Sequence, residues 1–188
     1  MTPPVSRYGP VSPTIALVAA PLTAVLLALQ ISAPGIPPRT VRQAEDVAAF
    51  ILAKAGVSVS FGSQGSYRIQ IMTAPLRNLS ADAAGFAVLT PGDWGYAAIS
   101  YPAVEQTANS LEADTGDLLG AAIAHEVGHL LLGKAHTRSG IMQARFRLRE
   151  IEMAGRGELL FDAGQAGKLR AKIRSQSTSI PARAESRQ

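Results

Sequence analysis

Residues 125–136 of this 188-residue chain read HEVGHLLLGKAH and contain all three of its histidines. His125 and His129 are four residues apart, a spacing that places both imidazoles on one face of a helix. The surrounding residues 117–132 are apolar enough to form that helix, and Gly133 can end it by adopting a positive φ. Two histidines and a glutamate are costly in such apolar surroundings unless they are used. The stretch therefore predicts a metal site.

The spacing fits zinc. Zinc accepts imidazole nitrogens at about 2.0–2.1 Å and favours tetrahedral coordination. Glu126 points roughly 100° around the helix from His125, so it can accept a proton from a metal-activated water without binding the ion itself. His136 is the third histidine, and a turn after Gly133 can bring it to the same ion. The chain has no cysteine, which excludes thiolate metal sites, disulfides and a cysteine nucleophile.

The motif, its following glycine, a third histidine and a tight turn bearing methionine resemble the metzincin clan of zinc metallopeptidases. The resemblance implies one catalytic zinc ion and three ligands to it, namely His125, His129 and His136. It also implies that Glu126 is the general base, Gly133 the helix-ending glycine and Met142 the methionine beneath the metal. An ordinary core methionine is the alternative for Met142. The stretch HEVGHLLLGKAHTRSGIM is also similar to small exported bacterial proteins.

The spacing of the motif in this chain differs from that of the metzincin clan at one point. Three residues, not two, separate His129 from Gly133, and one extra helical residue rotates the helix exit by about 100° and lengthens it by about 1.5 Å. The third ligand therefore has rivals. Glu150 or Glu152 could take its place, as a downstream glutamate does in the gluzincins, or there is no third protein ligand.

The same resemblance implies that substrate lies along an edge strand just upstream of the active helix. Residues 96–101 occupy that place, so Tyr96, Ala98 and Ser100 are the expected substrate contacts. An extended peptide can add to such an edge by backbone hydrogen bonds. A plain core strand is the alternative interpretation.

Apolar periodicity predicts the rest of the domain. Helices are expected at 40–55 and 162–174, and strands at 57–61, 67–72, 86–90 and 96–101. The predicted order is a helix, then the strands, then the helix at 117–132 and a last helix. This order is typical of an α+β fold. By resemblance, the fold is zincin-like or metzincin-like, with a small mixed sheet, an N-terminal helix, an active-site helix and a C-terminal helix.

Residues 15–33 carry no charge and are long enough for a membrane segment. We expect residues 1–33 to be a cleaved signal peptide or an uncleaved anchor, with a buried core helix as the alternative. Arg7 ahead of the run favours an extracytoplasmic location, secreted or membrane-anchored. A proline-rich linker is then expected at 34–39, the metallopeptidase-like domain at 40–174 and a disordered polar tail at 175–188.

The net charge is +4, and most basic residues follow Gly133. Such a region can touch nucleic acid or anionic lipid, but no nucleic-acid motif is present, so we expect a solvated surface and no specific nucleic acid partner. Arg145, Arg147 and Arg149 alternate with apolar residues, which also indicates solvated side chains. The expected partner is a peptide or protein substrate. The leading hypothesis is a zinc metalloendopeptidase, and the alternative is a zinc-binding, non-catalytic scaffold.

Overall fold

The computed structural model describes residues 24–63, 65–74, 85–90 and 94–178. These residues form a mixed sheet of five strands in the order β2-β1-β3-β5-β4, and five helices. The strands are β1 (Val25–Ser32), β2 (Val57–Phe61), β3 (Tyr67–Met72), β4 (Gly85–Thr90) and β5 (Trp94–Ser100). The helices are α1 (Pro38–Lys54), α2 (Tyr101–Ser110), α3 (Thr115–Leu132), α4 (Leu148–Gly155) and α5 (Ala163–Thr178). Neighbouring strands are parallel except for β4, which is antiparallel to β5.

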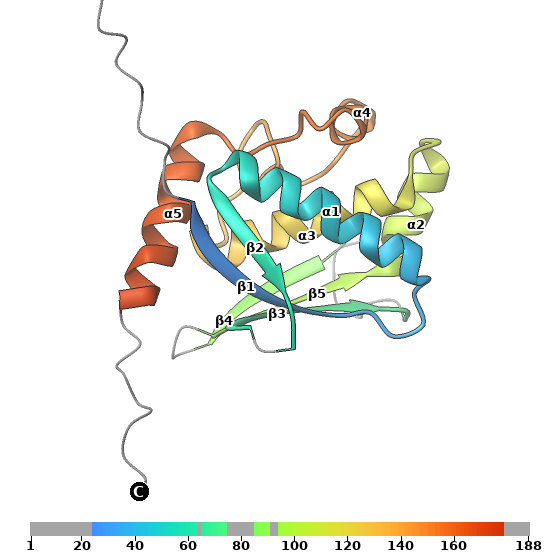
Figure 1. Cartoon of the computed structure of the whole chain (residues 1–188). Coiled ribbons are helices and arrows are strands. Elements are labelled where there is room, and N and C mark those ends of the chain that lie inside the picture. Colours follow the sequence, from blue (N-terminus) through green and yellow to red (C-terminus); the bar gives the residue numbers. More distant parts are fainter. Residues whose placement is uncertain (1–23, 64, 75–84, 91–93, 179–188) are drawn as a thin grey trace, which may run out of the picture.

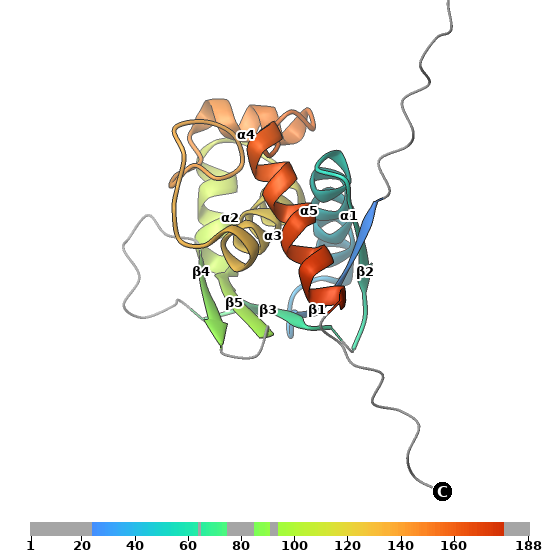
Figure 2. The same ribbon diagram turned by 90° about the vertical axis from the view of Figure 1, so that its left-hand side faces the viewer.

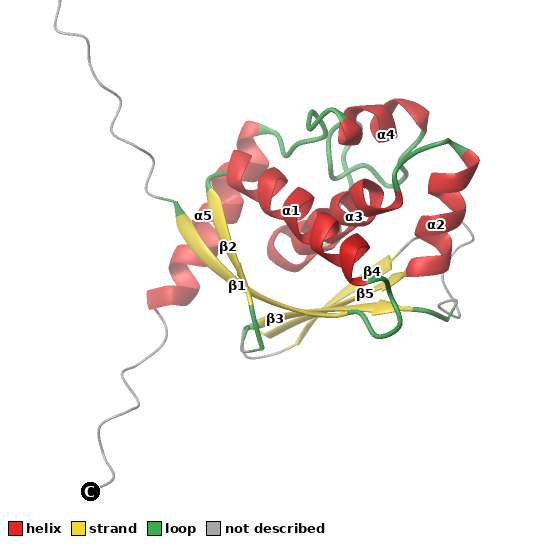
Figure 3. Ribbon diagram, turned by 45° about the vertical axis from the view of Figure 1, so that its right-hand side comes forward, coloured by secondary structure: helices red, strands yellow, loops and turns green. Residues whose placement is uncertain are grey.

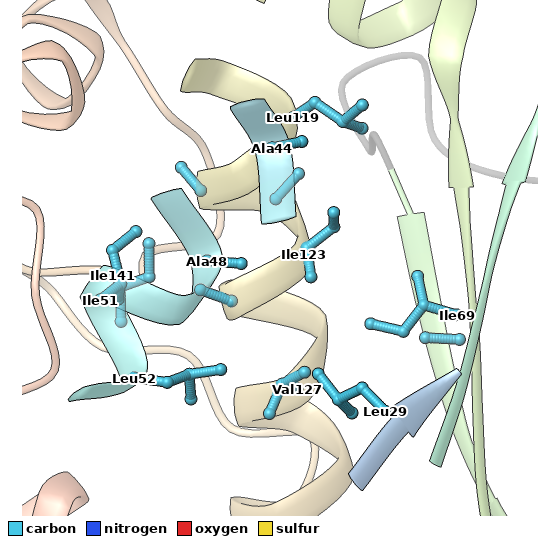
Figure 4. Close-up of a cluster of buried hydrophobic side chains, with 14 of the residues drawn as sticks. Leu29, Ala44, Ala48, Ile51, Leu52, Ile69, Leu119, Ile123, Val127 and Ile141 are labelled. Carbon is cyan, nitrogen blue, oxygen red and sulfur yellow. The ribbon is translucent and has the colours of Figure 1, made fainter. Parts of the chain in front are cut away.

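The molecule has two layers, with the sheet on one side and the described helices on the other (Figure 1, Figure 3). The core lies between the layers. Figure 4 shows Ala44 and Ala48 of α1 against α3, with Leu29 and Ile69 of the sheet beyond that helix. Gly120 lets the two helices approach closely, because a Cβ there would lie 2.6 Å from the Cβ of Val47. This packing holds α3 firmly across the sheet.

β1 lies inside the sheet, between β2 and β3. Its side chains alternate, with Leu27 and Leu29 buried and Leu26 exposed. The sequence predicts a signal peptide or anchor over residues 1–33 and a domain that begins at residue 40, whereas the structure places residues 25–32 inside the sheet. Strands of parallel sheets commonly have continuous apolar sequences. In β1, apolar residues also occupy exposed positions, so the sequence does not show which side chains are buried and which are exposed. Residues 15–23 of that run lie outside the described residues.

Other boundaries differ less. β2 and β3 have the predicted bounds, and α1 begins at Pro38, so most of the expected linker is the turn between β1 and α1. α2 is an unexpected helix whose N-cap is Ser100, with Pro102 in its first turn. α5 continues to Thr178, so the first four residues of the expected tail are helical, and residues 179–188 lie outside the described part. None of the described helices is long and apolar enough to cross a membrane.

Leu29→Ala tests the position of β1. Leu29 is fully buried, and replacing a buried leucine by alanine leaves a cavity, so the free energy of unfolding should fall by about 2–5 kcal/mol. The matched control is Leu26→Ala on the same strand, whose side chain is 65% exposed. It should change stability by about 0.5 kcal/mol or less. Equal effects in chemical denaturation would contradict a strand with one buried face.

Candidate metal centre

α3 carries three of the predicted site residues: His125, Glu126 and His129. The helix begins at a capped turn, where the Asp114 carboxylate accepts hydrogen bonds from the backbone N–H groups of Gly116 (2.7 Å) and Asp117 (3.1 Å). It ends at Gly133, whose φ of 92° lies in the region that favours glycine. Caps at both ends set the bounds of the helix that carries the histidine pair. Gly133 is thus the helix-ending residue that the sequence predicts.

The three histidines converge. Nε2 of His129 lies 2.9 Å from Nε2 of His125 and 3.1 Å from Nε2 of His136. All three ligand atoms lie within 4.8 Å of one another, and they form the one potential metal-binding group of this kind among the described residues. The structure therefore brings His136 to the pair in spite of the extra helical residue before Gly133.

The rival third ligands lie outside this group. Glu150 is buried, and its carboxylate accepts a hydrogen bond from the backbone N–H of Arg147 (3.1 Å), which caps α4. Glu152 is exposed on the same helix and lies near Arg156. Both glutamates thus take part in other contacts.

Backbone carbonyls orient two of the imidazoles. Nδ1 of His125 donates to the carbonyl of Ile141 (2.7 Å), and Nδ1 of His129 donates to the carbonyl of Gly133 (3.0 Å). Because a carbonyl only accepts, both Nδ1 atoms carry the hydrogen and both Nε2 lone pairs face the shared centre. Lone pairs this close repel one another without a cation between them. A tetrahedral zinc would hold such nitrogens about 3.3 Å apart, so the residues present fit this ion.

The surroundings of His125 and His136 favour the neutral form of both imidazoles. Burial lowers the pKa of His125 to about 4, reinforced by His129 and His136 and opposed by the bond to Ile141. Burial and the nearby His129 also lower the pKa of His136. Neutral imidazole is the form that binds metals, so the lowered pKa values of these two side chains favour cation binding.

Glu126 lies beside the histidines and is only 4% exposed. Burial raises the pKa of its carboxyl group to about 8. Its Oε2 has no hydrogen-bond partner among the described residues. Its Oε1 faces Gly85 of β4, where a Cβ would lie only 2.6 Å away. The absence of a side chain at Gly85 leaves room for the carboxylate, a requirement that sequence spacing does not reveal.

Met142 lies beneath the active helix. It is almost completely buried, and its carbonyl accepts a hydrogen bond from the backbone N–H of Thr137 (2.8 Å), closing the turn after His136. Its sulfur packs directly against Gly128, between the two histidines of α3, where any Cβ would overlap it. The methionine therefore supports the helix turn that carries the ligands. In the sequence, a glycine inside an apolar helix is the one feature that could have indicated this close contact.

Gly128→Ala tests the contact with Met142. The added methyl group should force the methionine aside and lower the free energy of unfolding by about 1–3 kcal/mol. Gly128→Ala combined with Met142→Ala should cost less than the sum of the single changes, because the second change removes the overlap. Gly167→Ala in α5, where a Cβ meets nothing within 4 Å, is the control and should stabilise the helix. Additive effects in denaturant titrations would contradict the contact.

The prediction that residues 96–101 lie at the edge of the sheet is wrong. β5 pairs with β3 on one side and β4 on the other, so Tyr96, Ala98 and Ser100 lie inside the sheet. β4 takes the edge position beside the metal centre. Strand order depends on pairing between distant segments, which local sequence patterns do not encode.

A cleft of about 500 Å³ contains the histidines and Glu126. Its walls come from α2, α3, Gly85 of β4 and residues 143–147. Figure 2 shows α2 and β4 on the same side of α3. The Phe146 ring meets the His125 ring edge to face, with centroids 5.6 Å apart. The cleft is thus open to a ligand at the metal centre. Sequence patterns missed α2, which forms one of its walls.

No protein-family model and no curated protein sequence matches this chain. A solved structure does match, the crystal structure of archaemetzincin from Methanopyrus kandleri. The sequence identity is 14%, the TM-score is 0.53, and the match covers 84% of this chain and 99% of that one. At this identity the likeness concerns the fold alone. The chain therefore has a metzincin-like fold, built around three histidines that can bind a metal ion.

Proposed function

We propose that this protein is a zinc-dependent metallopeptidase in which Glu126 is the general base. The observation that carries the proposal is the convergence of three histidine Nε2 atoms within 4.8 Å beside a buried glutamate, all lining one cleft. The fold likeness to archaemetzincin and the sequence resemblance to metzincins support the same conclusion.

Each residue of the centre has a distinct task in peptide hydrolysis. His125, His129 and His136 would hold the ion, and the carbonyls of Ile141 and Gly133 keep two of the rings in position. Bound zinc supplies Lewis-acid chemistry, which polarises a carbonyl group and makes water more acidic. Oε2 of Glu126, which has no hydrogen-bond partner in the described part of the chain, accepts a proton from water and delivers it to the leaving amine. The hydroxyl adds to the carbonyl carbon, and the C–N bond breaks to give a carboxylic acid and an amine.

β4 offers the place where a substrate chain can lie. It is the edge strand beside the cleft, and an extended peptide can pair with such an edge through backbone hydrogen bonds. Gly85, at its start, lies against Oε1 of Glu126. A peptide bound along β4 would therefore pass next to the general base.

The proposal is tested by incubating the zinc-loaded full chain with a mixture of peptides and identifying new amino termini by mass spectrometry. We expect cleavage that stops when zinc is chelated. Stoichiometric zinc with no cleavage of any peptide would contradict the proposal and indicate a zinc-binding, non-catalytic module.

A further inference from the structure

His136 differs from the other two histidines of the metal centre. Its side chain is exposed, whereas those of His125 and His129 are partly buried. The rings of His125 and His129 each donate Nδ1–H to a backbone carbonyl, but Nδ1 of His136 has no hydrogen-bond partner among the described residues. The position of His136 therefore depends on residues 134–143, which we call the ligand loop.

Thr137, the residue after His136, takes part in the bonds that shape the ligand loop. Its backbone N–H donates to the carbonyl of Met142 (2.8 Å), and its Oγ1 donates to the carbonyl of Ser139 (2.9 Å). Both bonds lie within the loop, so they set its internal shape. Its attachment to the rest of the domain comes from other elements.

The segment that leads into α5 contacts the ligand loop at two points. The carbonyl of Leu160 accepts a hydrogen bond from the backbone N–H of Ile141 (3.1 Å). Nε2 of Gln165, in the first turn of α5, lies 3.5 Å from Oγ1 of Thr137 and donates a long hydrogen bond to it. The second contact reaches the residue next to His136, so it is the one that bears on the third ligand.

Gln165 is a buried polar residue whose amide does more than cap its helix. Its Oε1 accepts a hydrogen bond from the backbone N–H of Asp162 (3.0 Å), and its own backbone N–H donates to the Asp162 carboxylate (2.8 Å). These two bonds form a capping box, for which a side-chain acceptor is sufficient. The Nε2 donor is not part of the cap, and it is the group that faces Thr137.

We propose that Gln165 is a positioning residue that keeps His136 within reach of the zinc ion by holding Thr137. The inference rests on the zinc-binding part of the proposed function and does not require peptide hydrolysis. An exposed loop that is already in place loses less conformational entropy when its histidine binds the ion. Removing the contact should therefore weaken zinc binding without removing a ligand.

Gln165→Ala removes the contact, and competition with a chromophoric chelator measures the zinc affinity of the full chain. The dissociation constant should rise about three- to tenfold, the range expected for the loss of one ordinary hydrogen bond. The matched control is Gln176→Ala near the other end of α5, where the amide accepts a hydrogen bond from the Tyr67 hydroxyl (2.7 Å). This control should bind zinc as the wild type does.

A second measurement shows whether Gln165 acts through His136. Gln165→Ala is repeated in the His136→Ala background, where no third histidine is left to position. It should then change the dissociation constant by less than about twofold, so the two changes are non-additive. Thr137→Val removes the acceptor but leaves the cap of α5 intact, and it should weaken zinc binding at least as much as Gln165→Ala. Chemical denaturation of the zinc-free variants shows which of them are folded.

Each failure has its own signature. Unchanged zinc affinity in folded Gln165→Ala, or in Thr137→Val where Gln165→Ala does not fold, overturns the proposal. An equal loss with and without His136 also overturns it, because the residue then acts through the fold as a whole. Tight zinc binding in His136→Ala overturns the proposal together with the ligand assignment. A chain that binds zinc and cleaves no peptide overturns the peptidase function and leaves this inference standing.

Discussion

Glu126→Gln is expected to lower kcat/KM for peptide hydrolysis by about 10²–10⁴-fold, the usual contribution of a general base. Glutamine keeps the shape of the side chain but cannot accept the proton of the attacking water. Zinc content should stay at one ion per chain, because Glu126 lies outside the group of three histidines. The measurement pairs steady-state kinetics with metal analysis of the same preparation.

The control for this variant is Glu45→Gln on α1, the same substitution at a half-buried residue that does not line the metal-centre cleft. It should retain wild-type activity. Near-normal turnover in Glu126→Gln would show that another group takes the proton. Loss of zinc together with activity would show instead that the glutamate shapes the metal site.

His136→Ala is expected to weaken zinc binding by more than about 100-fold, since even changes outside the ligand set cost about 10–100-fold. Only His125 and His129 would then remain in the group. A competition titration against a chromophoric chelator measures the affinity directly. Glu150→Ala and Glu152→Ala, at the rival ligand positions, are the controls and should bind zinc as the wild type does. Unchanged affinity in His136→Ala, with loss in a glutamate variant, would reassign the third ligand.

The metal centre could be predicted from the sequence because its geometry is local. Residues four apart on a helix share a face whatever the rest of the chain does, and Gly133 marks the end of the helix. The structure shows how the extra residue is accommodated. The helix continues to Leu132, and the positive φ of Gly133 then turns the chain so that His136 meets His129.

The features that the sequence did not reveal depend on distant parts of the chain. β1 is a buried strand of a parallel sheet, and its apolar run has the same appearance as a membrane segment. The edge position of β4 depends on pairing with β5. α2 was missed because Pro102 suggests a stop after a strand, whereas proline is also favoured in the first turn of a helix.

The alternation of Arg145, Arg147 and Arg149 predicts exposed side chains, and they are exposed. Residues 143–147 also form a wall of the metal-centre cleft. That position depends on how the turn after His136 packs, which spacing alone does not specify.

The most direct test of a zinc-dependent peptidase is the rate of peptide hydrolysis as zinc is returned to chelator-treated protein. We predict no activity without metal and a linear rise that levels off at one zinc per chain. Full activity in the presence of chelator, or no activity at any amount of zinc, would contradict the account.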